Sequence, residues 1–175
     1  MAVKDPDLVR GLILSSCPHY VNEHTRALCQ HWIRQAQHGQ WAALRWSLTY
    51  YTFTPNVWLQ TFDPFVEHFW LSPLACPLLD RIGKPRYPER FERLVAPLLD
   101  LDNRGILPHL GCPTLVIGGG EDRVIDASVQ REMAQLIPKS RLKLSAGYGH
   151  GNSLVNPDYP QEVQRFLEEV MAPTR

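Results

Sequence analysis

The sequence lacks an excess of charge of either sign. Its 18 Lys and Arg residues balance 18 Asp and Glu residues among 175 residues in all. A chain with balanced charge produces no strong field that would hold nucleic acid or an anionic membrane surface. It also contains no apolar run near the roughly 18 residues that indicate a membrane-spanning helix. We therefore expect a small-molecule substrate or ligand, and neither nucleic acid nor a membrane as a partner.

Cysteine is scarce as well. The four cysteines have no C-x-x-C spacing and lie in apolar or helical surroundings, at Cys17, Cys29, Cys76 and Cys112. Leu14-Ser15-Ser16-Cys17 is similar to a lipoprotein cleavage site, but the apolar run before it covers only residues 11–14, against roughly 7–15 residues in a signal peptide. The pattern favours buried free thiols in a reducing compartment, so we predict a cytoplasmic protein.

The sequence offers little for a metal or a cofactor. His24, His31 and His38 recur every seven residues and share one face of a predicted helix. Seven residues of helix rise about 10.5 Å, whereas Zn–N bonds measure about 2.0–2.1 Å, so no two of them can bind one ion. The glycines at 118–120 match neither G-x-x-x-x-G-K-[ST] nor G-x-G-x-x-G. We expect no metal and no cofactor.

The strongest pattern in the sequence lies between residues 110 and 150, where two predicted strands, a helix and two candidate site residues follow one another. Residues 113–118 form a short apolar β-branched run that predicts a buried strand, followed by glycines and Asp122. An amphipathic helix is predicted over 127–137, and a second strand over 141–146 precedes Gly149-His150. The right-handed crossover of such a unit brings both strand ends to one edge of a parallel sheet. Asp122 and His150 should therefore face one crevice, where open α/β sheets bind ligands.

At these residues the chain resembles the α/β-hydrolase family. The matching pattern is Pro113-Thr114-Leu115-Val116-Ile117 running into Gly119-x-x-Asp122, and later Gly149-His150. In that family an acid after the penultimate strand orients the His after the last strand, and the His activates a nucleophile encoded earlier in the chain. The resemblance implies that Asp122 is the orienting acid and His150 the general base. Glu121 and Asp126 are competitors for the role of the acid.

The remaining elements extend the same resemblance. A strand over 9–15 is similar to the family strand that follows the helix behind the nucleophile, although it could also be the first strand of a small α/β fold. The predicted fold class is α/β, as the C-terminal part of an α/β-hydrolase fold with about three parallel strands. Residues 1–20 and 105–175 are expected to form the partial core. Residues 21–104 are expected to form a helical cap, or lid, inserted between the first two strands.

The expected cap is rich in aromatic residues. Helices are predicted over 22–38, 41–51, 56–70 and 89–101, and all five Trp residues fall in the first three. Aromatic side chains bury large apolar areas and often line pockets. We predict that Trp46, Trp58 and Phe62 line a substrate pocket. The alternative, that these residues only hold the cap helices together, is equally compatible with the pattern.

The nucleophile is the missing part of this site. The family places it in a G-x-S-x-G turn, and these 175 residues contain no such pentapeptide. Ser15, Ser16 and Cys17 end a strand on the correct sheet edge, but Pro18-His19 provides neither the strained turn nor the helix terminus that a nucleophile needs.

The expected function is therefore hydrolysis of a small ester, lactone or similar substrate, by a protein of which this chain is the C-terminal part. The isolated chain is expected to be inactive. Two alternatives remain: a catalytically dead chain that binds a small apolar ligand, and a half-protein whose sheet another chain completes. The open edge of strand 9–15 predicts self-association or pairing with another chain.

Overall fold

The computed structural model describes residues 2–54, 80, 84–85 and 87–172. The chain forms two compact units. The first, here called the core unit, comprises Met1–Tyr20 and Asp102–Arg175; the second, the helical unit, comprises Val21–Leu101.

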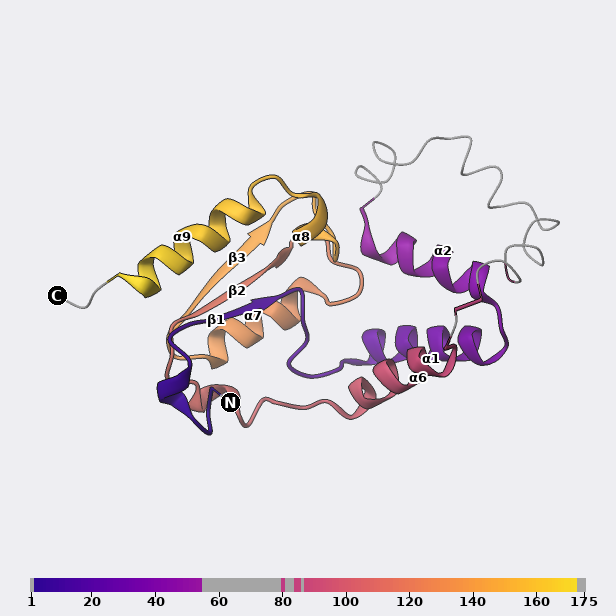
Figure 1. Cartoon of the computed structure of the whole chain (residues 1–175), viewed down its shortest axis with the longest axis horizontal. Helices are drawn as coiled ribbons and strands as arrows, with labels where there is room; N and C mark the ends of the chain where they lie inside the picture. Colours follow the sequence, from indigo (N-terminus) through magenta and orange to yellow (C-terminus); the bar gives the residue numbers. More distant parts are fainter. Residues whose placement is uncertain (1, 55–79, 81–83, 86, 173–175) are drawn as a thin grey trace. The chain divides into compact units, whose positions relative to one another are not determined.

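The core unit is built on a parallel three-stranded sheet (Figure 1). Its strands are β1 (Leu12–Ser15), β2 (Thr114–Gly119) and β3 (Ser140–Ser145), in the order β1-β2-β3. Leu14 pairs with Val116, which pairs in turn with Leu142. Because β2 is central, all of its residues are buried. The predicted α/β class with three parallel strands is confirmed.

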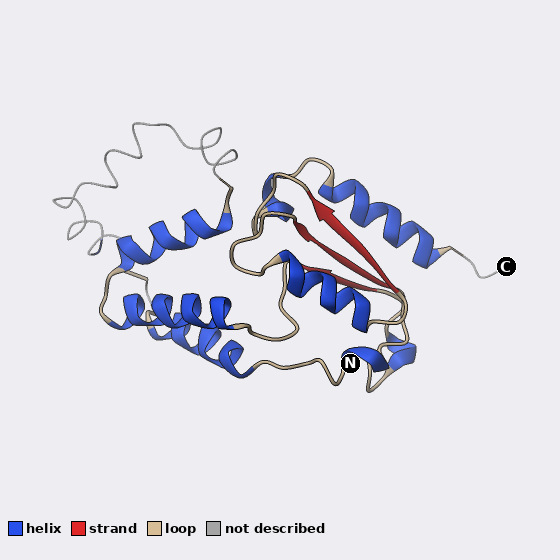
Figure 2. Cartoon of the chain, turned by 180° about the vertical axis from the view of Figure 1, so that it is seen from behind, coloured by secondary structure: helices blue, strands red, loops and turns tan. Residues whose placement is uncertain are grey.

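Two helices cover the opposite faces of this sheet (Figures 1 and 2). Alternate residues of β2 point to opposite faces. Val116 therefore packs in a cluster with Met133 of α7 (Ala127–Leu136). Leu115 and Ile117 pack with Phe166 of α9 (Tyr159–Met171) on the other face. A strand buried on both faces explains the unbroken apolar run from which it was predicted.

Several element boundaries differ from the sequence-based expectation. β1 begins at Leu12, not at residue 9, because Arg10 lies in a bend. Leu12 then donates the first strand hydrogen bond to the Pro113 carbonyl at 3.0 Å. A short helix, α8 (Asn152–Val155), occurs where only a polar turn was expected. Four residues are too few for a helical period to be visible in sequence. Two 3₁₀ turns also lie in this unit, η1 (Pro6–Leu8) and η3 (Leu107–His109).

The helical unit contains α1 (Glu23–Gln37), α2 (Trp41–Thr52), α6 (Glu89–Val95) and the 3₁₀ turn η2 (Ala96–Asp100). The Asn22 side chain caps α1 by accepting the Thr25 N–H at 2.8 Å. Gly39, at φ +69°, follows the end of α1 in the left-handed conformation that favours glycine. The helix predicted over 89–101 is α-helical only to Val95, because Pro97 has no N–H to donate. The helix predicted over 56–70 lies outside the described residues.

The side chains of α1 include a buried Trp that bonds to α2 and three histidines that lie at the surface. Trp32 is buried and its Nε1 donates to Ser47 Oγ of α2 at 2.9 Å. His24, His31 and His38 are exposed along the same helix. Within the part of the chain that the structure describes, no three His, Cys, Asp or Glu residues are grouped as metal ligands. None of the helices described is both long and apolar enough to cross a bilayer.

His19, in the core unit, gives the folded chain a dependence on pH. The ring is buried, with Nε2 3.5 Å from Glu132 Oε1. Burial lowers the pKa of His19 below its ordinary 6.5, and the nearby Glu132 carboxylate opposes this shift only in part. The unfolded chain therefore binds a proton at His19 more readily than the folded chain does. The contribution of neutral His19 to the free energy of unfolding is fully present above about pH 6.5. It is lost as the pH drops through and below that value.

We therefore expect urea unfolding midpoints to decline between pH 7 and pH 5, and a His19→Gln variant to show a shallower decline. The matched control is His109→Gln, at an exposed His of the same unit, which should keep the wild-type pH profile. Identical profiles for wild type and His19→Gln would contradict this prediction.

Candidate functional site

Asp122 follows the carboxyl end of β2 and is held there by the backbone. Its side chain is 0 % exposed. Oδ1 accepts the backbone N–H of Val124 and of Ile125, each at 2.8 Å. A buried carboxylate needs such donors, because an unpaired charge in the interior is costly. These two hydrogen bonds leave Oδ2 as the oxygen that can meet a further partner.

That partner is His150. Its Nδ1 lies 3.0 Å from Asp122 Oδ2, and its side chain is 31 % exposed. With the carboxylate accepting the Nδ1 proton, the ring takes the tautomer in which Nε2 carries a lone pair. The structure thus brings together the two residues expected to share one crevice. Chemically, the pair can take up a proton at Nε2 and stabilise the resulting imidazolium.

Gly119 allows the two strand ends to meet. The loop after β3 hydrogen-bonds to the loop after β2, since Gly120 N–H donates to Ser145 at 2.8 Å and Glu121 N–H to Tyr148 at 2.9 Å. A Cβ at position 119 would lie 2.2 Å from the carbonyl oxygen of Tyr148 and 2.3 Å from that of Gly149. Only glycine fits this approach, which carries His150 to Asp122.

The two competing acids lie at the surface, and one of them caps a helix. Glu121 and Asp126 are both exposed. Asp126 Oδ1 accepts the Ser128 N–H at 2.7 Å and so caps α7. The acid that reaches His150 is therefore Asp122.

A buried polar network lies behind the His150 loop and was not predicted. Asn156 Nδ2 donates to Asn152 Oδ1 and to Ser145 Oγ, each at 2.9 Å. Tyr159 OH donates to Ser15 Oγ at 2.9 Å. These bonds tie α8 and the start of α9 to the ends of β3 and β1. Asn in a polar stretch is typical of turns, so the sequence carried no signal for its burial.

The residues after β1 show no activated nucleophile. Ser15 Oγ is the acceptor of the Tyr159 hydroxyl. Ser16 does have a strained left-handed conformation, at φ +43°, which was not expected after this strand. Its Oγ is buried with no hydrogen-bond partner among the described residues, so no base there activates it. Burial raises the pKa of the Cys17 thiol, which favours the protonated and unreactive form.

The predicted pocket residues are only partly described. Trp46 lies half-buried on α2, whereas Trp58 and Phe62 lie outside the described residues. A cavity of about 470 Å³ occurs between α2 and α6 of the helical unit, and Trp46 does not line it. Its lining is mostly apolar with two guanidinium groups: Trp41, Leu44, Arg45, Leu48, Pro85, Tyr87, Arg90 and Phe91.

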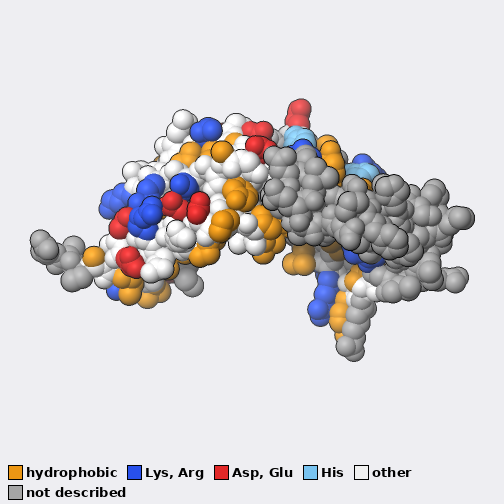
Figure 3. Space-filling model, turned by 90° about the horizontal axis from the view of Figure 1, so that it is seen from above, with side chains coloured by type: hydrophobic (Ala, Val, Ile, Leu, Met, Phe, Trp, Pro, Cys, Tyr) orange, Lys and Arg blue, Asp and Glu red, His pale blue; other side chains and the backbone are white. Residues whose placement is uncertain are grey.

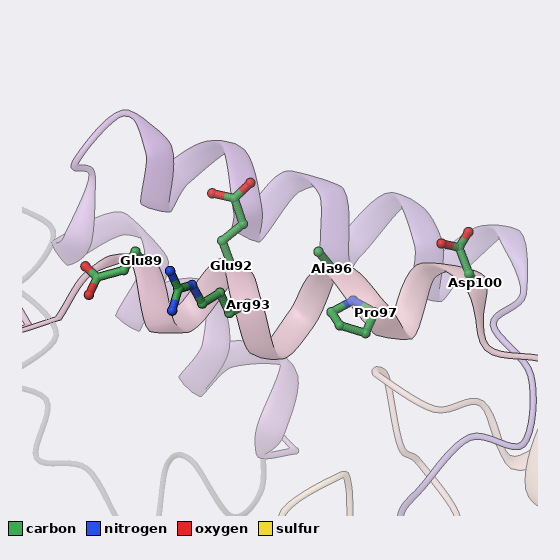
Figure 4. Close-up of a pocket in the computed structure, with 6 residues that line it drawn as sticks. All are labelled: Glu89, Glu92, Arg93, Ala96, Pro97 and Asp100. Atoms are coloured by element: carbon green, nitrogen blue, oxygen red, sulfur yellow. The ribbon is translucent and has the colours of Figure 1, made fainter.

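A second hollow follows α6 and η2 (Figure 4). Its charged side chains, Glu89, Glu92, Arg93 and Asp100, are spread along the helix and do not converge on a point. Four charged groups spread in this way cannot share one ligand, so we assign no site there.

The surface of the core unit mixes charges of both signs. Arg141 pairs with Glu169 at 3.0 Å, and Lys143 pairs with Glu162 at 3.0 Å, which lowers the pKa of the Glu162 carboxyl. Figure 3 likewise shows basic and acidic side chains lying beside one another. Pairs of this kind cancel much of the local field of each charge.

Curated proteins similar to this chain include esterases. Pimeloyl-[acyl-carrier protein] methyl ester esterase of Xanthomonas oryzae pv. oryzae is 35% identical over 89 residues, which are 50% of this chain and 35% of that protein. Polyketide synthase ThaQ of Burkholderia thailandensis is 35% identical over 75 residues, 42% of this chain and 4% of that protein. The matched part thus spans about a third of the esterase and a small fraction of the synthase.

Solved structures show the same fold over nearly the whole chain. MGS-M2, an alpha/beta hydrolase enzyme from a Medee basin deep-sea metagenome library, superposes with a TM-score of 0.76 at 18% identity, covering 99% of this chain and 60% of that one. The enol-lactonase of Burkholderia xenovorans LB400 gives a TM-score of 0.70 at 19% identity, covering 95% and 59%. The family model described as alpha/beta hydrolase fold matches residues 1–157, and the chain belongs to this family.

Proposed function

We propose that this chain supplies the acid and the general base of an ester hydrolase. The observation that carries the proposal is the 3.0 Å contact between His150 Nδ1 and Asp122 Oδ2. In this role His150 Nε2 takes the proton of an attacking hydroxyl and later gives it to the leaving alcohol. Asp122 keeps the ring in the required tautomer and stabilises the imidazolium.

The substrate we propose is a small ester or lactone of a carboxylic acid. The name of the Xanthomonas oryzae relative supports a methyl ester, and the enol-lactonase with the same fold supports a cyclic one.

We further propose that the helical unit acts as the cap and that Trp46, Trp58 and Phe62 contact the acyl part of the substrate. Mutation of these three residues should then raise KM more than it lowers kcat.

The nucleophile, in this proposal, comes from a segment or chain outside the 175 residues. Support comes from the absence of a G-x-S-x-G sequence and from the unactivated Cys17. The 175 residues alone should therefore release no stoichiometric burst of p-nitrophenol from p-nitrophenyl acetate beyond that of a His150→Ala control. A burst in the wild type that is lost in the variant would show that the chain holds its own nucleophile.

A reconstituted enzyme tests the proposed function directly. It joins residues 1–175 to the N-terminal part of the Xanthomonas oryzae esterase, cut just before the strand equivalent to β1, where the family's chain order places the nucleophile. We expect hydrolysis of short p-nitrophenyl and methyl esters that requires His150. A folded but inactive reconstituted enzyme, verified by circular dichroism, would instead favour a non-catalytic chain that binds small molecules.

We also propose that the outer edge of β1 pairs with another strand. β1 bonds to β2 on one side, and it lies at the end of the described sheet. An apolar parallel strand with open backbone groups is prone to pairing between chains. The isolated chain should therefore self-associate in light scattering, and the reconstituted enzyme should do so much less. A stable monomer at high concentration would contradict this proposal.

A cytoplasmic location remains our proposal as well. It is supported by Cys17, Cys29 and Cys112, which are free thiols in the described part of the chain. Free cysteines, two of them buried here, are typical of a reducing compartment. Alkylation and mass analysis of the protein isolated from its native cells should find all of them reduced.

A further inference from the structure

Gln130 is a buried polar residue that the proposed chemistry does not use. It lies on α7 and is 0 % exposed, between apolar neighbours of the helix such as Val129 and Met133. Burying an amide costs free energy unless its polar atoms find partners. The Gln130 Nε2 donates to the backbone carbonyl of Ile125 at 3.3 Å.

The partner of Gln130 is part of the turn that holds the acid. The N–H of the same Ile125 donates to Asp122 Oδ1 at 2.8 Å. The other oxygen of that carboxylate meets His150 Nδ1 at 3.0 Å. A continuous series of hydrogen bonds therefore runs from α7 through Ile125 and Asp122 to the imidazole of His150.

Gly118 makes room for this arrangement. A Cβ at position 118 would lie 2.0 Å from Gln130 Oε1 and 2.8 Å from its Cδ. Oε1 itself is buried without a hydrogen-bond partner among the described residues. Packing alone does not explain such a residue, because Leu or Met would fill a similar volume without burying an unpaired acceptor. What Gln130 adds is the bond to Ile125.

We propose that Gln130 is a positioning residue that fixes the turn of residues 122–125 and thereby aims the Asp122 carboxylate at His150. The proposal rests on the proposed function of Asp122 and His150 as an acid–base pair. Gln130 acts through Ile125 and Asp122 and touches no substrate.

The test replaces Gln130 with Met, which keeps the length of the side chain and removes the donor. By NMR, the amide protons of Val124 and Ile125 should exchange about tenfold faster relative to Val116 of β2, since one hydrogen bond supporting the turn is lost. The low-field signal of the His150 Nδ1 proton should broaden or disappear. Val129→Ala is the matched control, because it removes buried volume from the same helix and leaves the bond to Ile125 intact.

Unchanged exchange at Val124 and Ile125, together with an unchanged His150 signal, would overturn the proposal. Should Gln130→Met fail to fold, the wild-type chain provides a second measurement. A scalar coupling across the hydrogen bond from Gln130 Nε2 to the Ile125 carbonyl is expected, and its absence would overturn the proposal equally.

These readouts need no turnover, so they separate the positioning role from the proposed function. Signals that change in Gln130→Met, beside a reconstituted enzyme that hydrolyses no ester, would uphold the positioning role and reject the hydrolase. In an active reconstituted enzyme, Gln130→Met should also lower kcat with little change in KM.

Discussion

Replacing His150 with alanine in the reconstituted enzyme is expected to lower kcat by about 10⁴- to 10⁶-fold. Among the described residues, the imidazole is the group that contacts the Asp122 side chain and can accept a proton, and its Nδ1 lies 3.0 Å from the acid. KM should change little, because the base acts in the transition state and not in ground-state binding. Steady-state hydrolysis of p-nitrophenyl butyrate measures both constants.

Asp122→Asn is expected to lower kcat by about 10⁴-fold in the same enzyme. An asparagine oxygen can still accept the N–H of Val124 and Ile125, so the turn is retained. Its amide nitrogen, however, donates to the ring and favours the tautomer with the proton on Nε2, which cannot act as a base. Glu121→Gln, at the exposed neighbouring acid, and His109→Ala are the matched controls and should retain activity within about twofold, as surface changes usually do. A comparable loss of kcat in Glu121→Gln would mean that Asp122 is not the acid that orients His150.

Gly119→Ala is expected to destabilise the chain by about 3 kcal/mol or more. Its Cβ would lie 2.2 Å and 2.3 Å from two backbone carbonyl oxygens, of Tyr148 and Gly149. Backbone cannot move aside as a flexible side chain can, so the ends of β2 and β3 must separate. Urea unfolding followed by circular dichroism measures the loss, and NMR should show Asp122 and His150 no longer paired.

The control for this variant is Gly111→Ala. Position 111 is exposed and a Cβ there would meet no atom within 4 Å. Its effect should stay within about 0.5 kcal/mol. If Gly119→Ala proved equally mild, the close approach of the two loops would not be what brings His150 to Asp122.

The positions of the acid and the His could be predicted from sequence because topology alone sets them. The apolar run at Leu115–Ile117 predicts a buried strand, and the alternating pattern before Gly149 predicts a second one. A parallel crossover between two such strands leaves no choice about the edge at which Asp122 and His150 emerge. The start of the first helix was equally local: it was predicted at residue 22, and the Asn22 side chain caps that helix by accepting the Thr25 N–H.

The parts that could not be predicted depend on contacts between distant residues. Gln130 looks like an ordinary polar position of an amphipathic helix, and only the absence of a side chain at Gly118 lets it enter the core. Asn152 and Asn156 look like turn residues, yet they are buried and bonded to each other. The start of β1 was misplaced because Val9 continues the apolar pattern, whereas the chain bends at Arg10. Each outcome follows from tertiary packing, which no local pattern encodes.

The most direct measurement of the acid–base pair is kcat of the double variant Asp122→Asn/His150→Ala in the reconstituted enzyme. If the carboxylate works solely through the imidazole, removing it from an enzyme that already lacks His150 should change kcat by no more than about threefold. A further loss as large as that of Asp122→Asn alone would mean that the two residues act independently, and the pairing seen at 3.0 Å would not be the catalytic unit.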